Sequence, residues 1–289
     1  MSVVIFLQAG LVAIMLSLGL SLTVADFKRV LVFPKAVILA LFCQMLILPV
    51  TCFFIAKGFG LSPELAVGLM LLSATPGGVT ANLFSHLSNG DVALNITLTA
   101  INSLLCLFSL PLILALSLAY FIEDDRVIPP QFSKIVEVFL VVVIPVMIGM
   151  YLRHRLPQFT EKLVRPMKLA AALFMLAMIA MVCIKQWDTL AQYFPVIGGA
   201  VLLFNLMSIG TGYGGALLAK LSKKQAIAIG MEVGIHNATL SMAVAFSPHL
   251  LNNPTMAIPS SVYGLTMLIT ASVFGFWVRE RAKTGTVPA

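Results

Sequence analysis

The sequence has little charge. Asp, Glu, Lys and Arg make up only 10% of its 289 residues, while 60% of the residues are hydrophobic. An ordinary soluble domain carries roughly 25% charged residues, so a water-soluble enzyme, a disordered chain and a small disulfide-stabilised secreted domain are excluded. The four cysteines lie inside apolar runs without C-x-x-C spacing, which argues against a thiol-based redox or metal centre. A mean hydropathy of +1.04 indicates a membrane protein.

Three other patterns are missing. The apolar runs are continuous, whereas the strands of an outer-membrane barrel alternate polar and apolar residues. The first run, 3–23, has no basic stretch before it and is long enough to span a bilayer, so it does not resemble a cleavable signal. The net charge of +7 is spread between apolar runs and forms no contiguous patch, so nucleic acid is not an expected partner.

Hydropathy predicts an all-α membrane protein that forms a single polytopic domain over residues 1–289. Nine spans are expected, at about 3–23, 36–56, 63–88, 91–121, 133–152, 168–186, 195–219, 223–247 and 257–278. With the N-terminus outside, 14 of the 18 basic residues fall in inner loops and the C-terminal tail, and the acidic run Glu123–Asp125 falls outside. The positive-inside rule therefore predicts an inner (plasma) membrane protein with an external N-terminus and a cytoplasmic C-terminus.

Two of these spans are interrupted. The third contains Pro76, Gly77 and Gly78, where proline removes a backbone donor and glycine disfavours helix. The eighth contains Glu232, followed by His236 and Asn237. Unwound backbone at membrane depth is tolerated only where it is buried in protein or lines a cavity. Paired breaks point to a transporter binding site, and their offset of five spans predicts inverted repeats.

Glu232 is the acid that the predicted spans place deepest in the membrane. A carboxylate at the bilayer centre costs a few kcal/mol on insertion scales. Since no lysine or arginine lies at its depth, the missing countercharge is expected to be a mobile cation or a proton. The alternative is a protonated glutamate that is hydrogen-bonded between helices.

Neutral oxygens accompany this acid. The spacing of Asn95, Thr99 and Asn102 puts them on one helical face, and Asn82 lies in the broken third span. Hard cations such as sodium prefer carboxylate, carbonyl and hydroxyl oxygens. Interhelical hydrogen bonding is the alternative role for this stripe, and it is the expected role for the isolated amide of Gln44.

Three motifs resemble the bile acid:sodium symporter family: Pro76–Asn82, Asn89–Asn95 and Glu232–Asn237. The resemblance covers nearly the whole chain. It implies a panel domain and a core domain, with two broken helices that cross in the core. The panel would comprise helices 3–23, 133–152 and 168–186, and the core helices 36–56, 63–88, 91–121, 195–219, 223–247 and 257–278.

The resemblance also implies binding residues. The first sodium site would use the carbonyl of Ala81 with Asn82, Asn95, Thr99 and Glu232. The second would use Gln44, Glu232, the backbone of Val233 and Ile235, and His236. The family commonly has glutamine at this last position, and an imidazole supplies no amide oxygen. The substrate would meet Val79, Thr80 and Asn237.

The resulting hypothesis is a sodium-coupled symporter of organic anions that works by alternating access. Its partners would be one or two sodium ions, membrane lipid and a bile-acid-like anion or a small carboxylate such as pantoate or a keto acid, with no protein partner implied. An alternative is a proton-coupled or sodium-independent transporter that uses Glu232 and His236. An intramembrane enzyme or receptor is disfavoured, because the sequence shows no metal-ligand cluster, Ser-His-Asp set or large sensor domain.

Overall fold

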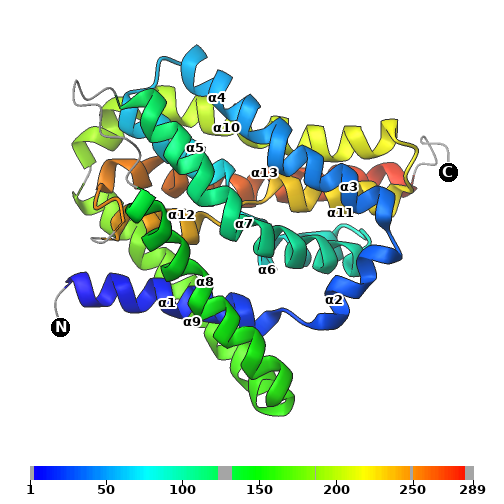
Figure 1. Ribbon diagram of the computed structural model, residues 1–289. Helices are drawn as coiled ribbons and strands as arrows, with labels where there is room; N and C mark the ends of the chain where they lie inside the picture. The colour runs from blue at the N-terminus through cyan, green and yellow to red at the C-terminus, as the bar shows by residue number, and fades with distance from the viewer. Residues whose placement is uncertain (1–2, 123–131, 186, 248–249, 284–289) are drawn as a thin grey trace.

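The computed structural model describes residues 3–122, 132–185, 187–247 and 250–283, and every regular element among them is helical. The helices form one bundle (Figure 1), which confirms the predicted all-α class for this part of the chain. In chain order they are α1 (Val3–Ser21), α2 (Val24–Lys28), η1 (Arg29–Leu31), α3 (Pro34–Phe42), η2 (Cys43–Ile47), α4 (Leu48–Gly58), α5 (Pro63–Ser73), α6 (Val79–Leu87), α7 (Val92–Phe121), α8 (Phe132–Arg155), α9 (Pro157–Lys185), α10 (Trp187–Leu218), α11 (Lys223–Gly234), α12 (Ala238–Phe246), η3 (Pro254–Ala257) and α13 (Ile258–Lys283). The acidic run Glu123–Asp125 lies outside the described residues.

Several helices are long and apolar enough to cross a membrane. Within the described residues five segments qualify: 34–58, 92–121, 194–218, 223–246 and 254–280. Apolar side chains on their outer faces, such as Ile38, Phe54 and Phe276, are 66–69% exposed, a surface that lipid tails would cover. Each of the nine predicted ranges overlaps a helix or a pair of helices, but the count of nine crossings stays a prediction.

The second predicted span contains a helical irregularity that the sequence analysis did not anticipate. Between α3 and α4 the chain makes a π-helical turn over Cys43–Ile47, and Gln44 lies in it. Pro49, two residues after this turn, cannot donate a backbone hydrogen bond to the preceding turn, which favours a local change of helical pitch. The π turn places the Gln44 amide in the buried interior, where 2% of the residue is exposed.

Both predicted interruptions are present. Helix α5 ends at Ser73 and α6 begins at Val79, with Pro76, Gly77 and an extended Gly78 between them. Helix α11 ends at Gly234 and α12 begins at Ala238. The α12 start is capped by Asn237, whose side-chain oxygen accepts a 2.9 Å hydrogen bond from the Leu240 backbone.

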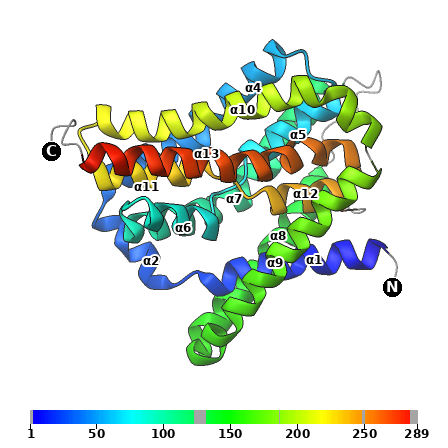
Figure 2. The same ribbon diagram turned by 180° about the vertical axis from the view of Figure 1, so that it is seen from behind.

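The two interrupted helices pack half against half. Helix α6 contacts α11, and α5 contacts α12, so the two breaks meet in the middle of the bundle (Figure 2). The Asn237 backbone N–H donates to the Pro76 carbonyl at 2.9 Å, and His236 Nδ1 lies 3.0 Å from the Thr75 carbonyl. Backbone groups freed by one break are therefore satisfied by the other, as burial away from water requires.

Two basic side chains make hydrogen bonds between helix ends at one end of the bundle. Lys35 Nζ donates to the Ala219 carbonyl at 2.5 Å. Arg279 donates to the Leu87 carbonyl at 3.2 Å, which caps the C-terminal end of α6. These bonds join the start of α3, the end of α10, the end of α6 and the end of α13.

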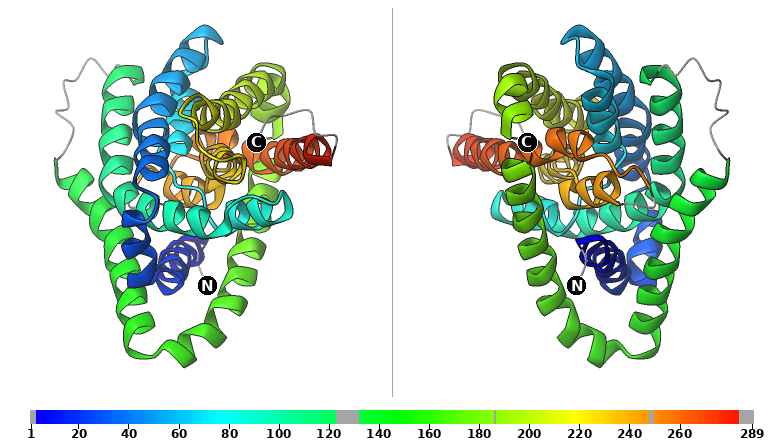
Figure 3. Two further views of the ribbon diagram at one scale, coloured as in Figure 1. Left: turned by 90° about the vertical axis from the view of Figure 1, so that its right-hand side faces the viewer. Right: turned by 90° about the vertical axis from the view of Figure 1, so that its left-hand side faces the viewer.

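Helices α1, α8 and α9 lie together beside the rest of the bundle. Figure 3 shows α1 nearly end-on between α8 and α9, and α1 contacts both. The α1–α8 contact depends on two glycines. A Cβ added at Gly149 would lie 2.5 Å from the Leu16 carbonyl oxygen and 2.7 Å from the Leu20 nitrogen, and one added at Gly19 would overlap the Val146 backbone. Small residues allow this close backbone approach, which is how many membrane helices associate.

We expect Gly149→Ala to destabilise the protein, because the added methyl group must push α1 away from α8. Overpacking of this kind costs about 1–3 kcal/mol. Gly210→Ala is the matched control, since a Cβ at Gly210 meets nothing within 4 Å and alanine is the better helix former. Thermal unfolding in detergent should show a lower midpoint for Gly149→Ala and an equal or higher one for Gly210→Ala; equal midpoints for the two variants would contradict the predicted role.

Candidate functional site

The centre of the candidate site is the carboxylate of Glu232, in the last turn of α11. The residue is fully buried. Thr99 Oγ1 donates to one carboxylate oxygen at 2.6 Å, and Asn102 Nδ2 donates to the other at 3.1 Å. Helix α7 therefore presents two donors to an acid about 130 positions later in the chain.

Gly77, in the α5–α6 break, lies directly against this carboxylate. A Cβ added at Gly77 would lie 2.6 Å from Glu232 Cδ and Oε2 and 2.7 Å from Oε1. Only a residue without a side chain leaves room for the acid at this point. The break thus brings bare backbone, and no side chain, to the carboxylate.

Among the described residues, no basic side chain forms a salt bridge with Glu232. Across the described ranges the salt bridge that occurs joins Arg29 to Asp26, and Glu232 takes part in none. No group of three or more His, Cys, Asp or Glu side chains that could hold a transition metal occurs there either. A buried carboxylate without a base is suited to a monovalent or hard cation or to a proton.

Several buried amide oxygens on α6 and α7, the helices packed around the end of α11, have no hydrogen-bond partner in the part of the chain that the structure describes. They include Oδ1 of Asn82, Asn95 and Asn102. The amide nitrogens of Asn95 and Asn102 are already used: the first donates to the Ala228 carbonyl at 2.7 Å, and the second donates to Glu232. Buried polar atoms are nearly always paired, so free amide oxygens beside an acid fit the ligand preference of a hard cation.

In the first predicted set, one side chain bonds directly to Glu232 and the others lie on helices packed around it. Thr99 touches Glu232 directly, and Asn95 is tied to α11 one turn before it, at Ala228. Ala81 and Asn82 lie on α6, which packs against α7 and α11. Asn102 belonged to the predicted polar stripe but not to the predicted sodium site, and it is a direct carboxylate partner.

The second predicted set is organised around the Thr75 carbonyl. Gln44 Nε2 donates to it at 3.1 Å and lies 3.4 Å from the Ser73 carbonyl oxygen, while His236 Nδ1 is 3.0 Å from the same Thr75 oxygen. The His236 ring is stacked on Phe204, with centroids 5.3 Å apart. Gln44 Oε1 and His236 Nε2 are buried without partners among the described residues.

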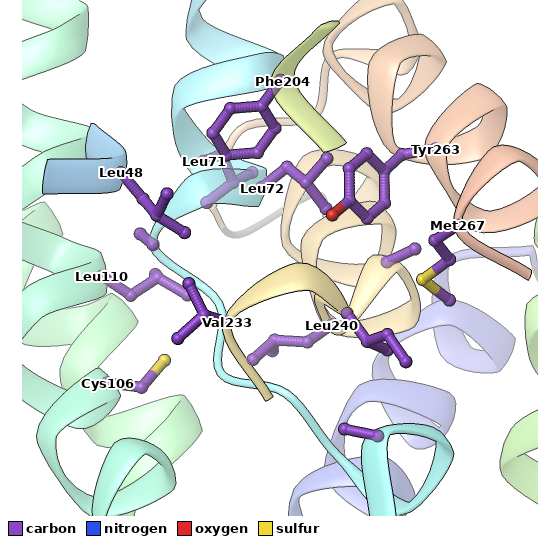
Figure 4. Packing of buried hydrophobic residues seen from close by; sticks show 14 of the residues in the cluster. Leu48, Leu71, Leu72, Cys106, Leu110, Phe204, Val233, Leu240, Tyr263 and Met267 are labelled. Carbon is purple, nitrogen blue, oxygen red and sulfur yellow. The ribbon is translucent and has the colours of Figure 1, made fainter. Parts of the chain in front are cut away.

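Glu232 and the Thr75 cluster have different hydrogen-bond partners. The carboxylate accepts hydrogen bonds from Thr99 and Asn102 on α7 and from the Gly77 backbone, whereas His236 contacts the Thr75 carbonyl. Val233 and Ile235 are buried apolar side chains, at 0% and 1% exposure. Figure 4 shows Val233 in the hydrophobic cluster that also contains Leu110. Val233 and Ile235 can therefore offer a ligand only their backbone groups.

The predicted substrate residues lie at the two helix starts beside the crossing. The side-chain oxygen of Asn237 is occupied as the α12 cap. Among the described side chains none caps the start of α6, where Val79 is the first residue and the partly exposed Thr80 is the second. The Val79 side chain lies outside what is described. Uncapped N–H groups at a helix start attract anions.

Residues that the sequence analysis did not single out hold the end of α11. Asn205 on α10 and Tyr263 on α13 both donate to the Gly234 carbonyl, each at 2.8 Å. The signal for Asn205 was available, because it is a lone amide inside an apolar span like Gln44. Tyr263 gave no such signal, since an aromatic residue in a span is ordinary.

Comparison with known proteins is consistent with this geometry. The sequence profile of the sodium bile acid symporter family matches residues 8–193. The chain is 28% identical over 270 residues to the uncharacterized sodium-dependent transporter YocS of Bacillus subtilis, covering 93% of this chain and 82% of that protein. It is 28% identical over 276 residues to the probable chloroplastic sodium/metabolite cotransporter BASS2 of Oryza sativa, covering 94% of this chain and 63% of the rice protein. It is 25% identical over 281 residues to the human ileal sodium/bile acid cotransporter, covering 95% and 79%.

We expect Gly77→Ala to displace the Glu232 carboxylate, because the new methyl group would occupy its position. The neighbouring Gly78→Ala is the control, since a Cβ there meets nothing within 4 Å. Thermal unfolding of purified protein in sodium chloride and in choline chloride tests both variants. Sodium should stabilise the wild type and Gly78→Ala but not Gly77→Ala, and an undiminished sodium effect in Gly77→Ala would refute the placement of the cation at Glu232.

Proposed function

The chain belongs to the sodium bile acid symporter family, and from that premise we propose that it is a sodium-coupled symporter of organic anions. The family consists of membrane transporters and not of enzymes, as the sequence analysis expected. The observation that carries the proposal is the buried Glu232 carboxylate without a basic partner, beside amide oxygens that have no hydrogen-bond partner among the described residues.

The proposed cation site joins three segments. Sodium would be held by Glu232 from α11, by the oxygens of Asn95 and Thr99 from α7, and by Asn82 with the Ala81 carbonyl from α6. Asn102 joins this set because it already contacts the acid. Sodium binding would neutralise the carboxylate and draw α6, α7 and α11 together, which orders the two breaks.

The proposed anion site lies on the same breaks. The uncapped start of α6 at Val79 and Thr80, with the neighbouring Asn237, would bind a carboxylate or another acidic group. Two relatives are named for bile acids or metabolites, and we extend that range here to bile-acid-like anions or small carboxylates such as pantoate and keto acids. Since sodium and substrate share the breaks, each should raise the affinity for the other.

Alternating access would use the grouping of helices. We assign α1, α8 and α9 to a panel and the helices within 36–121 and 195–278, which include both broken ones, to a core that moves against it. Lys35 and Arg279 lie at the same end of the bundle, and basic residues gather on the cytoplasmic side of a membrane protein. Their position supports the proposed orientation in the inner membrane, with the N-terminus outside and the C-terminus in the cytoplasm.

Glu232→Gln should abolish the sodium dependence of transport, because the amide keeps the shape of the side chain but removes its charge. Uptake of radiolabelled pantoate and of a bile acid into proteoliposomes, with an inward sodium or choline gradient, measures the effect. Glu64→Gln in the first turn of α5 is the control for losing an acid elsewhere. Sodium-driven uptake that survives in Glu232→Gln would overturn the assignment.

Proton coupling is the second candidate, because His236 is buried beside the crossing and its Nε2 has no partner among the described residues. Sodium coupling predicts that His236→Gln retains uptake driven by a sodium gradient at equal pH on both sides. Proton coupling predicts instead that uptake follows a pH gradient in sodium-free choline buffer and that His236→Gln loses it. The same vesicles, assayed in both buffers, separate the two mechanisms.

A further inference from the structure

The carbonyl at the end of α11 is held by a buried polar cluster from two other helices. The Gly234 carbonyl accepts hydrogen bonds from Asn205 Nδ2 on α10 and from the Tyr263 hydroxyl on α13, each at 2.8 Å. Both side chains are fully buried. A helix end normally leaves its last carbonyls to water or to a cap, and here the two side chains take that role.

Every polar group of this cluster has a partner. Asn205 Nδ2 also lies 2.8 Å from the Tyr263 oxygen, and Asn205 Oδ1 accepts a hydrogen bond from Thr270 on α13. This differs from Asn82, Asn95 and Asn102, whose oxygens have no partner in the described part of the chain. A fully satisfied buried network rigidifies its surroundings, so this cluster is suited to hold backbone in place and not to bind an ion.

A related amide contact occurs at the other break, although there the Gln44 oxygen has no partner among the described residues. Gln44 donates to the carbonyl of Ser73, the last residue of α5, from 29 positions earlier in the chain. Asn205 donates to the carbonyl of Gly234, the last residue of α11, also from 29 positions earlier. In both cases a side-chain amide from the preceding membrane segment, 34–58 or 194–218, bonds to the last residue of the helix before the break. The same type of contact, at the same spacing along the chain, indicates that the two halves of the chain hold the ends of their broken helices in a corresponding way.

The position of Gly234 connects this cluster to the acid. Gly234 is two residues after Glu232, and it is packed so closely on α10 that an added Cβ would overlap Ile209. Tyr263 also contacts His236 on the far side of the break, with ring centroids 5.4 Å apart. A shift of the Gly234 carbonyl would therefore move the last turn of α11 and its carboxylate relative to Thr99 and Asn102.

We infer that Asn205, Tyr263 and Thr270 are positioning residues, which set the cation affinity at Glu232 by fixing the end of α11 through the Gly234 carbonyl. The inference rests on the proposed sodium site. These side chains do not bind the cation themselves. They present Glu232 at the depth and angle at which the α7 and α6 oxygens surround it.

The test uses the full-length protein in detergent and sodium ion alone as the probe. Binding is followed by the thermal shift on titration with sodium chloride, with choline chloride keeping the ionic strength constant. Tyr263→Phe removes one hydroxyl and keeps the ring against His236. Since one hydrogen bond contributes about 1 kcal/mol, the half-saturating sodium concentration should rise about fivefold.

Two further variants make the outcome specific. Tyr120→Phe is the matched control, because that hydroxyl bonds to Lys57 on the exposed surface. Thr270→Val removes the donor to Asn205 with almost no change of volume and should shift the sodium response in the same direction as Tyr263→Phe. A merely structural role would lower the unfolding midpoint in choline chloride without changing the half-saturating sodium concentration.

The outcomes separate this inference from the proposed function. If the wild type shows no sodium-dependent shift, the proposed function itself fails. If the wild type responds to sodium and both Tyr263→Phe and Thr270→Val keep its half-saturating concentration, the sodium site stands and the positioning role is overturned. If both variants need more sodium while Tyr120→Phe does not, the positioning role is supported.

Discussion

The rest of the architecture depends on the burial of one carboxylate without a basic partner. Glu232 is fully buried, and its described hydrogen bonds come from a hydroxyl, a side-chain amide and the Gly77 backbone, none of which carries charge. Burying an unpaired charge is costly, so the site is stable when a cation or a proton supplies the missing charge. In the proposed mechanism, coupling follows from this electrostatic constraint, because helices that contribute to the carboxylate site also carry the breaks proposed to bind the substrate.

The breaks themselves impose a second constraint. Each one frees backbone groups at membrane depth, where water is not available to bond them. The chain satisfies these groups mutually: Asn237 bonds to Pro76, and Gln44 and His236 bond to Thr75. Outer helices add further bonds at Gly234. The unwound backbone is therefore held firmly beside the proposed cation site, so in the proposed mechanism one ion would act on both breaks.

The helices and their breaks were predictable because they depend on local sequence. Long apolar runs must form helices in lipid, and the Pro76-Gly77-Gly78 segment disfavours helix wherever it lies. The polar stripe of Asn95, Thr99 and Asn102 was likewise visible from spacing alone. The π turn at Gln44 was not visible, because its pitch depends on how α3 and α4 pack as well as on Pro49.

The sequence by itself determined the helical class, the two interruptions and the identity of the buried acid, because hydrophobic length and backbone preference are local properties. Only the tertiary structure decided which polar atoms are paired and which are free. Asn205 and Asn95 are the same residue type in similar apolar spans, yet every polar group of the first is bonded and the oxygen of the second has no partner among the described residues. That difference depends on side chains and backbone up to 133 positions away in the chain. The spacing of residues in the sequence therefore cannot predict which polar atoms are paired.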